Sequence, residues 1–293
     1  MESPISSIPH DTSLTEENFH HYTIDMRFTR HEVAFVMVDL WNTGFGPEPL
    51  SHLGWEAEYN AGKSFCDRAG KIELDKILPM LEACRHHGIT IVHAPTRDIA
   101  VKHEQWAKLA TEEERNPGKP KNSAEADSWP PKDWVAQWQK DHRYRFRTEQ
   151  WITDYYREVR PNQDIPAPLH PVDGDLVITC GSMMHRLMKE REIKVLFYCG
   201  FATNMCLIDK PGAIRDMHRR GYLPIVIRDA TTGTENAETV GNLGITRAMI
   251  DQIEMRWGYS ITTDDFLTAA EGRGPFDIPA RYLRMYKPLD ESQ

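Results

Sequence analysis

A cysteine lies where a predicted strand turns into a predicted helix. In residues 199–207 (CGFATNMCL), an apolar stretch ends at Gly200 and helical periodicity begins within a few residues, which places Cys206 near a helix N-terminus. The free N–H groups and the dipole at such a position favour a thiolate and can bind an oxyanion, so Cys206 is a candidate nucleophile. The alternative is that Cys206 is a small buried hydrophobic residue, which is the common role of a free cysteine.

An aspartate ends a second apolar stretch. Residues 36–42 read VMVDLWN, so Asp39 follows directly after a predicted buried strand. A carboxylate at the carboxyl end of a parallel strand faces the crevice in which open α/β sheets bind ligands. If the first and fourth strands are neighbours where the strand order reverses, Asp39 meets Cys206 and can accept its proton. The alternative role of Asp39 is a turn or helix cap.

The elements that must position these two residues alternate along the chain. Short apolar runs without strict alternation indicate strands covered on both faces, at residues 33–38, 90–93, 176–179, 195–199 and 223–227. Helical periodicity lies between or after them, at residues 72–87, 183–192, 205–220 and 237–257. This alternation predicts a parallel sheet with right-handed crossovers. Pro211 and Gly212 predict a kink in the helix over 205–220.

Three segments depart from this alternation. Residues 1–30 are predicted to form an N-terminal arm, and residues 266–293 a C-terminal arm, on either side of a single α/β domain over residues 31–265. Within that domain, residues 102–174 separate two consecutive strands by more than a crossover requires. Because this insertion is rich in Trp, Pro and Gly, we interpret it as a cap or an oligomer contact.

The motifs resemble those of the isochorismatase-like cysteine hydrolases. The resemblance rests on the runs around Asp39 and Cys206, on Thr-Arg-Asp at residues 96–98, and on Arg-Asp, Arg-Gly-Tyr and Arg-Asp-Ala-Thr at residues 215–216, 220–222 and 228–231. It covers about residues 30 to 265. It implies an α/β fold, a three-layer α/β/α sandwich with a six-stranded parallel sheet. It also implies an Asp, Lys and Cys triad that hydrolyses C–N bonds of small amides, ureides or carbamoyl compounds.

Site roles follow from this resemblance. By analogy Asp39 is the base and Cys206 the nucleophile. The peptide bond between Phe201 and Ala202 is expected to be cis, and the amides of Ala202 and Cys206 are expected to form the oxyanion hole. Trp41, Asn42, Phe45 and Phe201 are the predicted substrate-pocket residues, although for any single aromatic residue a place in the core is the alternative.

The triad lacks its lysine at the family position. The end of the third predicted strand holds Cys180 instead. Arg97, after the second strand, and His185 are candidates to replace the cation, although Arg97 can also be an ion-paired surface residue and His185 a solvent-facing one. A lysine of the insertion, such as Lys132 or Lys140, is a further alternative.

No metal and no cofactor is expected. Nicotinamidase-like members bind a metal through an aspartate and closely spaced histidines after the second strand, whereas residues 98–103 here read DIAVKH, with a different spacing. The five cysteines form no close pairs, which argues against a disulfide framework or a structural zinc site. The chain carries 35 basic and 44 acidic residues, a formal net charge of −9. That balance gives no basic footprint for nucleic acid or an anionic membrane, so the expected partner is a small-molecule substrate.

The first thirty residues contain no apolar signal segment, and nowhere do eighteen apolar residues follow one another, so we predict a cytoplasmic protein. Family resemblance implies a homodimer or homotetramer. The leading hypothesis is a C–N hydrolase that uses the thiol of Cys206. Two alternatives stay open. One is a pseudoenzyme or ligand-binding protein, because the lysine is missing and long segments are appended to the domain. The other is redox use of Cys180 with Cys206.

Overall fold

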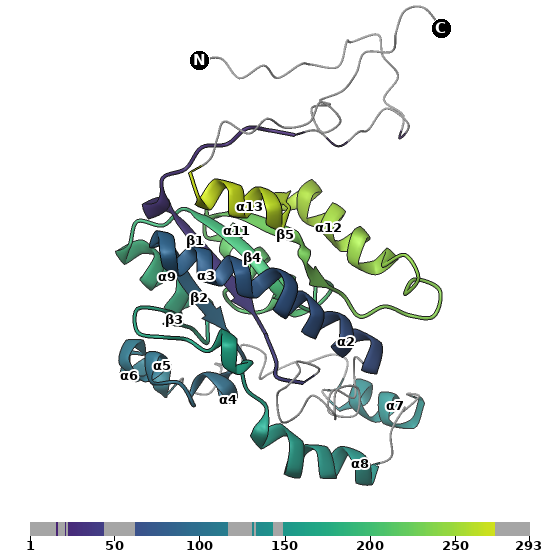
Figure 1. Ribbon diagram of the computed structural model, residues 1–293. Helices are drawn as coiled ribbons and strands as arrows, with labels where there is room; N and C mark the ends of the chain where they lie inside the picture. The colour runs from purple at the N-terminus through teal and green to yellow at the C-terminus, as the bar shows by residue number, and fades with distance from the viewer. Residues whose placement is uncertain are drawn as a thin grey trace, which may run out of the picture.

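The computed structural model (Figure 1) describes residues 16, 21, 23–43, 62–116, 131, 133–142 and 149–272. The predictions for Phe45 and Lys132, for most of the N-terminal arm and for residues 273–293 of the C-terminal arm therefore lie outside the described residues. Among the described residues, no helix is both long and apolar enough to cross a membrane.

Six parallel strands form one sheet, as expected, in the order β3-β2-β1-β4-β5-β6. Their bounds are β1 (Val33–Val38), β2 (Thr90–Ala94), β3 (Leu176–Val177), β4 (Val195–Phe201), β5 (Leu223–Thr232) and β6 (Tyr259–Ile261). The apolar runs predicted the first five. The sixth was missed because its three residues form a short edge strand without full burial. The order reverses between β1 and β4, which places the crevice at their carboxyl ends.

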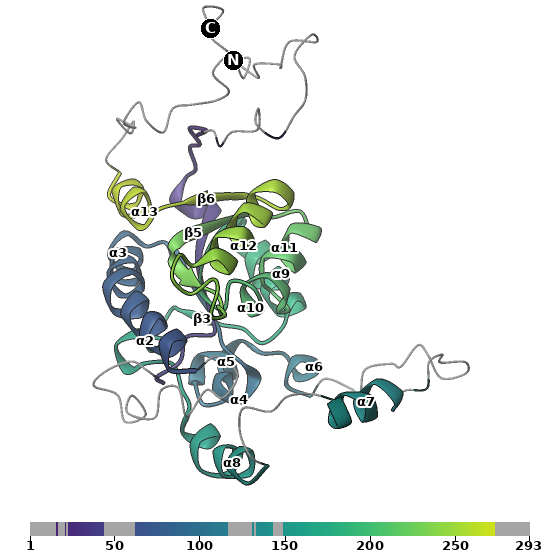
Figure 2. The ribbon, with the colours of Figure 1, turned by 90° about the vertical axis from the view of Figure 1, so that its right-hand side faces the viewer.

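Side chains of the sheet alternate between two cores. On β1, Phe35 and Met37 contribute to one cluster, and Val36 and Val38 to the other. Helices α2 (Gly62–Ile72), α3 (Leu78–His87) and α13 (Thr263–Ala270), with the π-helical turn η4 (Glu73–Ile77), cover the first face. Helices α9 (Gly181–Glu190), α10 (Cys206–Asp209), α11 (Ile214–Arg219) and α12 (Gly244–Arg256) cover the second, and Figure 2 shows the three layers edge-on.

Two predicted helices differ from those observed. The helix expected over 72–87 extends from α2 through η4 to α3, and it ends at Gly88, whose φ of 68° lies in the left-handed region that glycine favours. The helix expected over 205–220 is not kinked but broken into α10 and α11. Pro211 lacks a backbone donor and Gly212 has a φ of 86°, so neither continues the helix.

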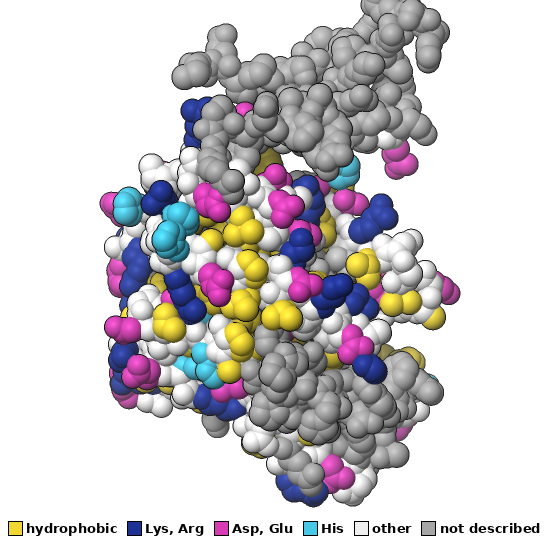
Figure 3. Space-filling view, in the orientation of Figure 1, with side chains coloured by type: hydrophobic (Ala, Val, Ile, Leu, Met, Phe, Trp, Pro, Cys, Tyr) yellow, Lys and Arg dark blue, Asp and Glu magenta, His cyan; other side chains and the backbone are white. Residues whose placement is uncertain are grey.

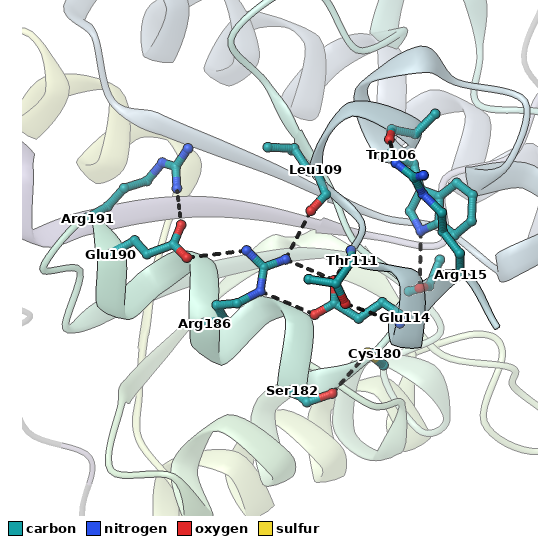
Figure 4. A network of polar contacts seen from close by, with 12 residues as sticks. Trp106, Leu109, Thr111, Glu114, Arg115, Cys180, Ser182, Arg186, Glu190 and Arg191 are labelled. Carbon is teal, nitrogen blue, oxygen red and sulfur yellow. Dashed lines mark hydrogen bonds and ion pairs between the residues drawn. The ribbon is translucent and has the colours of Figure 1, made fainter. Parts of the chain in front are cut away.

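The described part of the insertion is mostly helical and begins on the surface of the second face. It contains α5 (Glu104–Leu109), α6 (Glu112–Arg115), α7 (Trp134–His142), α8 (Glu149–Asp154), the π-helical turn η5 (Tyr155–Val159), and the 3₁₀ turns η6 (Arg160–Asn162) and η7 (Ala167–Leu169); α4 (Arg97–Ala100) precedes it. Arg186 of α9 donates to the carboxylate of Glu114 at 2.9 Å and to the carbonyl of Leu109 at 3.0 Å, which fixes α5 and α6 on α9 (Figure 4).

Figure 2 shows α7 standing away from the three layers. The side chains of Trp134 and Trp138 on α7 are more than half exposed. A role of this insertion in an oligomer contact stays a prediction.

The packed part of the chain continues past residue 265, where the C-terminal arm was expected to begin. Helix α13 ends at Ala270, and both Phe266 and Ala270 are buried. The ring of Phe266 packs against Phe35 and Phe197, with centroid distances of 5.4 and 5.2 Å. At the other end, the 3₁₀ turn η2 (Arg30–Glu32) leads directly into β1.

Candidate active site

Asp39 and Cys206 are brought to the same point of the sheet. Strands β1 and β4 are neighbours, and Val38 is paired with Gly200, so the residues that follow both strands leave the sheet side by side. Asp39 is 1% exposed, and its backbone turns there with a φ of 45°. This is the juxtaposition that the sequence predicted from strand order.

Gly200 allows the two strands to approach each other closely. Its φ is +101°, and a Cβ atom at this position would lie 2.1 Å from the carbonyl oxygen of Val38. Any side chain at residue 200 would therefore push β1 and β4 apart at the end of the sheet, just before the segments that carry Asp39 and Cys206. The glycine that ends the apolar run is required by this contact.

The loop between β4 and α10 is fastened to β5. The hydroxyls of Thr203 and Thr231 lie 2.7 Å apart in the core, and the Thr231 hydroxyl donates to the carbonyl oxygen of Gly200 at 2.7 Å. The backbone N–H of Thr234 donates to Oδ1 of Asn204 at 3.0 Å. These bonds hold the loop that leads to Cys206, the first residue of α10.

The peptide bond between Phe201 and Ala202 is cis, as the family resemblance implied. Ala202 is 4% exposed and begins the loop. The carbonyl oxygen of Ala202 accepts backbone hydrogen bonds from Met205 at 3.0 Å and from Leu207 at 3.2 Å, so the loop curls back on itself around this residue. Ala202 and Cys206 thereby belong to one compact turn.

Lys210 is the cation that the sequence analysis missed. Its Nζ atom donates to Oδ1 of Asp39 and, at 2.8 Å, to the carbonyl oxygen of Ala94 at the end of β2. The Lys210 side chain is 13% exposed. Lys210 ends α10 one turn after Cys206, and its backbone N–H bonds to the carbonyl oxygen of Cys206 at 3.1 Å. Only the spacing of four residues from Cys206, just before Pro211, could have pointed to it, because residues at i and i+4 share a helix face.

The electrostatics of the three residues favour a protonated thiol. Burial and the negative charge of Asp39 raise the pKa of Cys206 to about 12, while the positive charge of Lys210 acts in the opposite direction. Oδ1 of Asp39 accepts the hydrogen bond from Lys210, whereas Oδ2 is buried and accepts none from a nitrogen or oxygen atom of the described residues. Asp39 therefore keeps one carboxylate oxygen free of such donors.

The cations predicted to replace the family lysine are engaged elsewhere. The guanidinium of Arg97 donates to the carbonyls of Glu114 and Arg115 and lies over the ring of Trp106, 5.2 Å from its centroid. His185 lies 3.0 Å from the hydroxyl of Tyr222 through its Nδ1 atom.

Cys180, the residue at the family's lysine position, contacts the start of the helix that follows it. Sγ of Cys180 lies 3.2 Å from the hydroxyl of Ser182 at the beginning of α9 (Figure 4). All five cysteines are free thiols. Cys180 is not bonded to Asp39, and Lys210 occupies the place beside that carboxylate.

The predicted pocket residues fall in different surroundings. Phe201 is fully buried and packs edge-on against Phe65 at 6.1 Å, so its ring belongs to the core. Asn42 is also buried, and its side chain binds the insertion through the backbone of Asn162 at 3.3 Å and of Asp164 at 3.1 Å. Trp41 is partly buried against the first core. Phe201 and Asn42 therefore hold structure, and the role of the loop after β1 in a substrate pocket stays a prediction.

The acid and histidine after β2 pair with the insertion. Asp98 binds Arg160 at 2.9 Å, and His103 lies 2.8 Å from Oδ1 of Asp164. Among the described residues, one group of three side chains has the spacing to share a metal ion, His21 with Asp251 and Glu254 at the surface of α12. It includes neither Asp39 nor Cys206.

Comparison with known proteins agrees with this fold. A profile of the isochorismatase domain matches residues 34–253. Among solved structures, a cysteine hydrolase from Pseudomonas syringae pv. phaseolicola 1448A is similar, with 15% sequence identity and a TM-score of 0.51, over 86% of this chain and 98% of that chain. At this identity the likeness supports the fold alone.

Two further solved structures are similar at lower scores. An isochorismatase family protein from Desulfovibrio vulgaris subsp. vulgaris str. Hildenborough shares 16% identity with a TM-score of 0.42, over 82% of this chain and 97% of that one. A nicotinamidase from Bacillus subtilis shares 13% identity with a TM-score of 0.35, over 78% and 99%. A search of curated protein sequences gives no match.

Proposed function

Because this chain belongs to the isochorismatase family of hydrolases, we propose that it cleaves a C–N bond of a small amide, ureide or carbamoyl compound, with Cys206 as nucleophile. The observation that carries the proposal is the contact of Lys210 with Asp39 beside Cys206, at the reversal of strand order. Those three residue types make up the triad that the resemblance implied, with the lysine supplied from a different element.

In the proposed reaction, Asp39 accepts the thiol proton as the sulfur of Cys206 attacks the substrate carbonyl carbon. The carbonyl oxygen becomes an oxyanion, which the amides of Ala202 and Cys206 stabilise. Asp39 then gives the proton to the leaving nitrogen, and the C–N bond breaks. Water attacks the resulting thioester, or the thiocarbamate that a ureide or carbamoyl substrate leaves on sulfur, so that the C–S bond breaks, the carboxylic or carbamic acid is released, and the thiol is restored.

The two oxygens of Asp39 have separate roles in this scheme. Oδ1 is held by Lys210, so the carboxylate cannot rotate freely, and Oδ2 is left to receive the proton. The thiol is protonated at rest, since its pKa is raised to about 12. Proton transfer to Asp39 during attack therefore avoids a free thiolate in a buried site. The ammonium of Lys210 offsets the negative charge that develops as sulfur loses its proton.

The ligand-binding alternative rested on the missing lysine and on the long appended segments, and Lys210 beside Asp39 answers the first of these reasons. The test is to incubate the protein with a panel of primary amides, ureides and N-carbamoyl amino acids and to measure hydrolysis by the ammonia released. We expect at least one compound to be turned over and Cys206→Ala to abolish the reaction. Cys180→Ala is the matched control and should keep full activity. Turnover that survives Cys206→Ala with an unchanged rate would contradict the proposal.

A further inference from the structure

A carboxylic acid lies inside the protein next to the loop that carries Asp39. Glu73, in the π-helical turn η4, is 1% exposed, whereas its neighbour Leu74 is 49% exposed. The acid therefore points inward and the leucine outward, opposite to what their polarity favours. Figure 3 shows hydrophobic side chains among the charged ones on the face where α2 and α3 lie. An arrangement that reverses polarity in this way calls for a specific partner of the acid.

That partner is the backbone just after Asp39. Oε1 of Glu73 accepts a hydrogen bond from the N–H of Trp41 at 3.1 Å. The other oxygen, Oε2, is buried with no hydrogen-bond partner among the described residues. Burial raises the pKa of Glu73 well above its ordinary value and so favours the neutral acid. For a neutral carboxyl in the core, the hydrogen bond from the Trp41 N–H is the main polar interaction.

The helix periodicity explains how this contact is made. The buried face of α2 is formed by residues that include Cys66, Ala69 and Gly70, and Glu73 continues that face at a spacing of three to four residues. Glu73 is the first residue of the π-helical turn η4, which shifts only the side chains that follow it. Glu73 therefore faces the sheet, where it reaches the loop after β1.

The loop is held from its other side as well. Asn42 exchanges backbone and side-chain hydrogen bonds with Asp164 of the insertion, its backbone N–H donating to the Asp164 carbonyl at 2.9 Å. Asp39 itself, at a φ of 45°, is separated from Trp41 by one residue, Leu40, which is buried in the first core. Within residues 39–42, the backbone is therefore fixed at Trp41 by Glu73 and at Asn42 by the insertion.

We propose that Glu73 is a positioning residue: by holding the N–H of Trp41 it fixes the turn that aims the Asp39 carboxylate at Cys206 and Lys210. This inference rests on the proposed role of Asp39, but it concerns the geometry of the turn. It predicts that the contact needs an acceptor at residue 73 and does not need a charge.

The experiment measures the alkylation rate of Cys206 by iodoacetamide against pH, resolved per cysteine by mass spectrometry. Glu73→Gln keeps an acceptor oxygen and should reproduce the profile of the unmodified protein. Glu73→Leu removes the acceptor, releases the turn and weakens the influence of Asp39 on the thiol. Because that influence raises the Cys206 pKa, the pKa should fall, and one unit would speed alkylation about tenfold at pH 7.

Ile77→Ala is the matched control, since Ile77 ends the same turn, is fully buried and makes no contact through a polar atom. It should lower stability and leave the alkylation profile unchanged. If Glu73→Leu does not fold, Glu73→Met provides the same loss of acceptor with a flexible side chain. A profile for the folded apolar variant within twofold of the unmodified protein would overturn the inference. The alkylation readout does not require turnover, so failure of the proposed hydrolysis would be seen separately.

Discussion

The ammonium of Lys210 binds Oδ1 of Asp39, although 171 residues separate the two along the chain. The same ammonium reaches the carbonyl of Ala94, so the ends of β1 and β2 converge on this charge. Lys210 follows directly after α10, the helix that begins with Cys206. The thiol and the ammonium therefore come from one short segment beside Asp39, and each can be tested independently.

Replacement of Asp39 by Asn should separate reactivity from turnover. The variant removes the negative charge that raises the Cys206 pKa, so alkylation of Cys206 at neutral pH should become faster. Turnover should fall by about 100-fold or more, because the proton acceptor is lost. Asp98→Asn is the control, since Asp98 also follows a strand but pairs with Arg160. If the alkylation rate of Cys206 and the turnover both fall in Asp39→Asn, this prediction is contradicted.

Replacement of Lys210 by Met should act in the opposite direction on the thiol. Loss of the positive charge removes the influence that lowers the Cys206 pKa, so alkylation should slow at every pH below about 12. We expect turnover to fall by about 10-fold to 100-fold, because Asp39 is no longer held. Lys76→Met, which removes a lysine paired with Asp229 at 3.1 Å, should leave both rates unchanged. Faster alkylation in Lys210→Met would rule out the assigned role.

Replacement of Gly200 by Ala should disrupt the site through the sheet. The new Cβ would clash with the Val38 carbonyl, in addition to the cost of a positive φ. We expect a loss of roughly 3 kcal/mol in the free energy of unfolding, measured by urea denaturation, together with lost turnover. Gly221→Ala is a close control, because its φ is +91° but nothing lies within 4 Å of its Cβ position. Equal losses in the two variants would show that the strand contact does not matter.

Glu73 should make stability depend on pH. Its folded-state pKa is raised well above 4.5, so the folded state keeps a proton that the unfolded state loses as pH rises through 4.5. The free energy of unfolding, relative to that of Glu73→Gln, should therefore fall with rising pH from about 4.5 up to the raised pKa. The slope is about 1.4 kcal/mol per pH unit while the folded state stays protonated.

Glu235 provides a control of opposite sign for that measurement. Its carboxylate accepts hydrogen bonds from the backbone N–H groups of Ile245 and Thr246, and its pKa is lowered to about 2. The stabilisation is present above 4.5 and is lost as pH falls toward 2. Relative to Glu235→Gln, the unmodified protein should therefore gain stability as pH rises from 2 to 4.5.

For Glu73, the contradicting result is a difference in the free energy of unfolding between Glu73→Gln and the unmodified protein that stays constant from pH 5 to 8.

The local sequence was sufficient for most of the sheet and for two members of the site. Continuous apolar runs mark strands buried on both faces, and the end of β1 before Asp39 follows from the first polar residue after its run, whereas β4 continues two residues past the run predicted to end at Cys199. The family resemblance supplied the cis peptide before Ala202. The edge strand β6 is too short and too exposed to leave such a pattern.

The third member of the site and the partner of Glu73 depended on tertiary structure. Lys210 follows a helix of only four residues, Cys206–Asp209, which is too short for a periodic signal, and its charge reaches Asp39 and Ala94 only because β1 and β2 end beside it. Glu73 looks like an ordinary surface acid in sequence, although it lies on the buried face of its helix. Burial and apolar patterning are properties of a segment, so sequence determined them. Contacts between single polar atoms from distant segments arise only once the sheet order has brought those segments together.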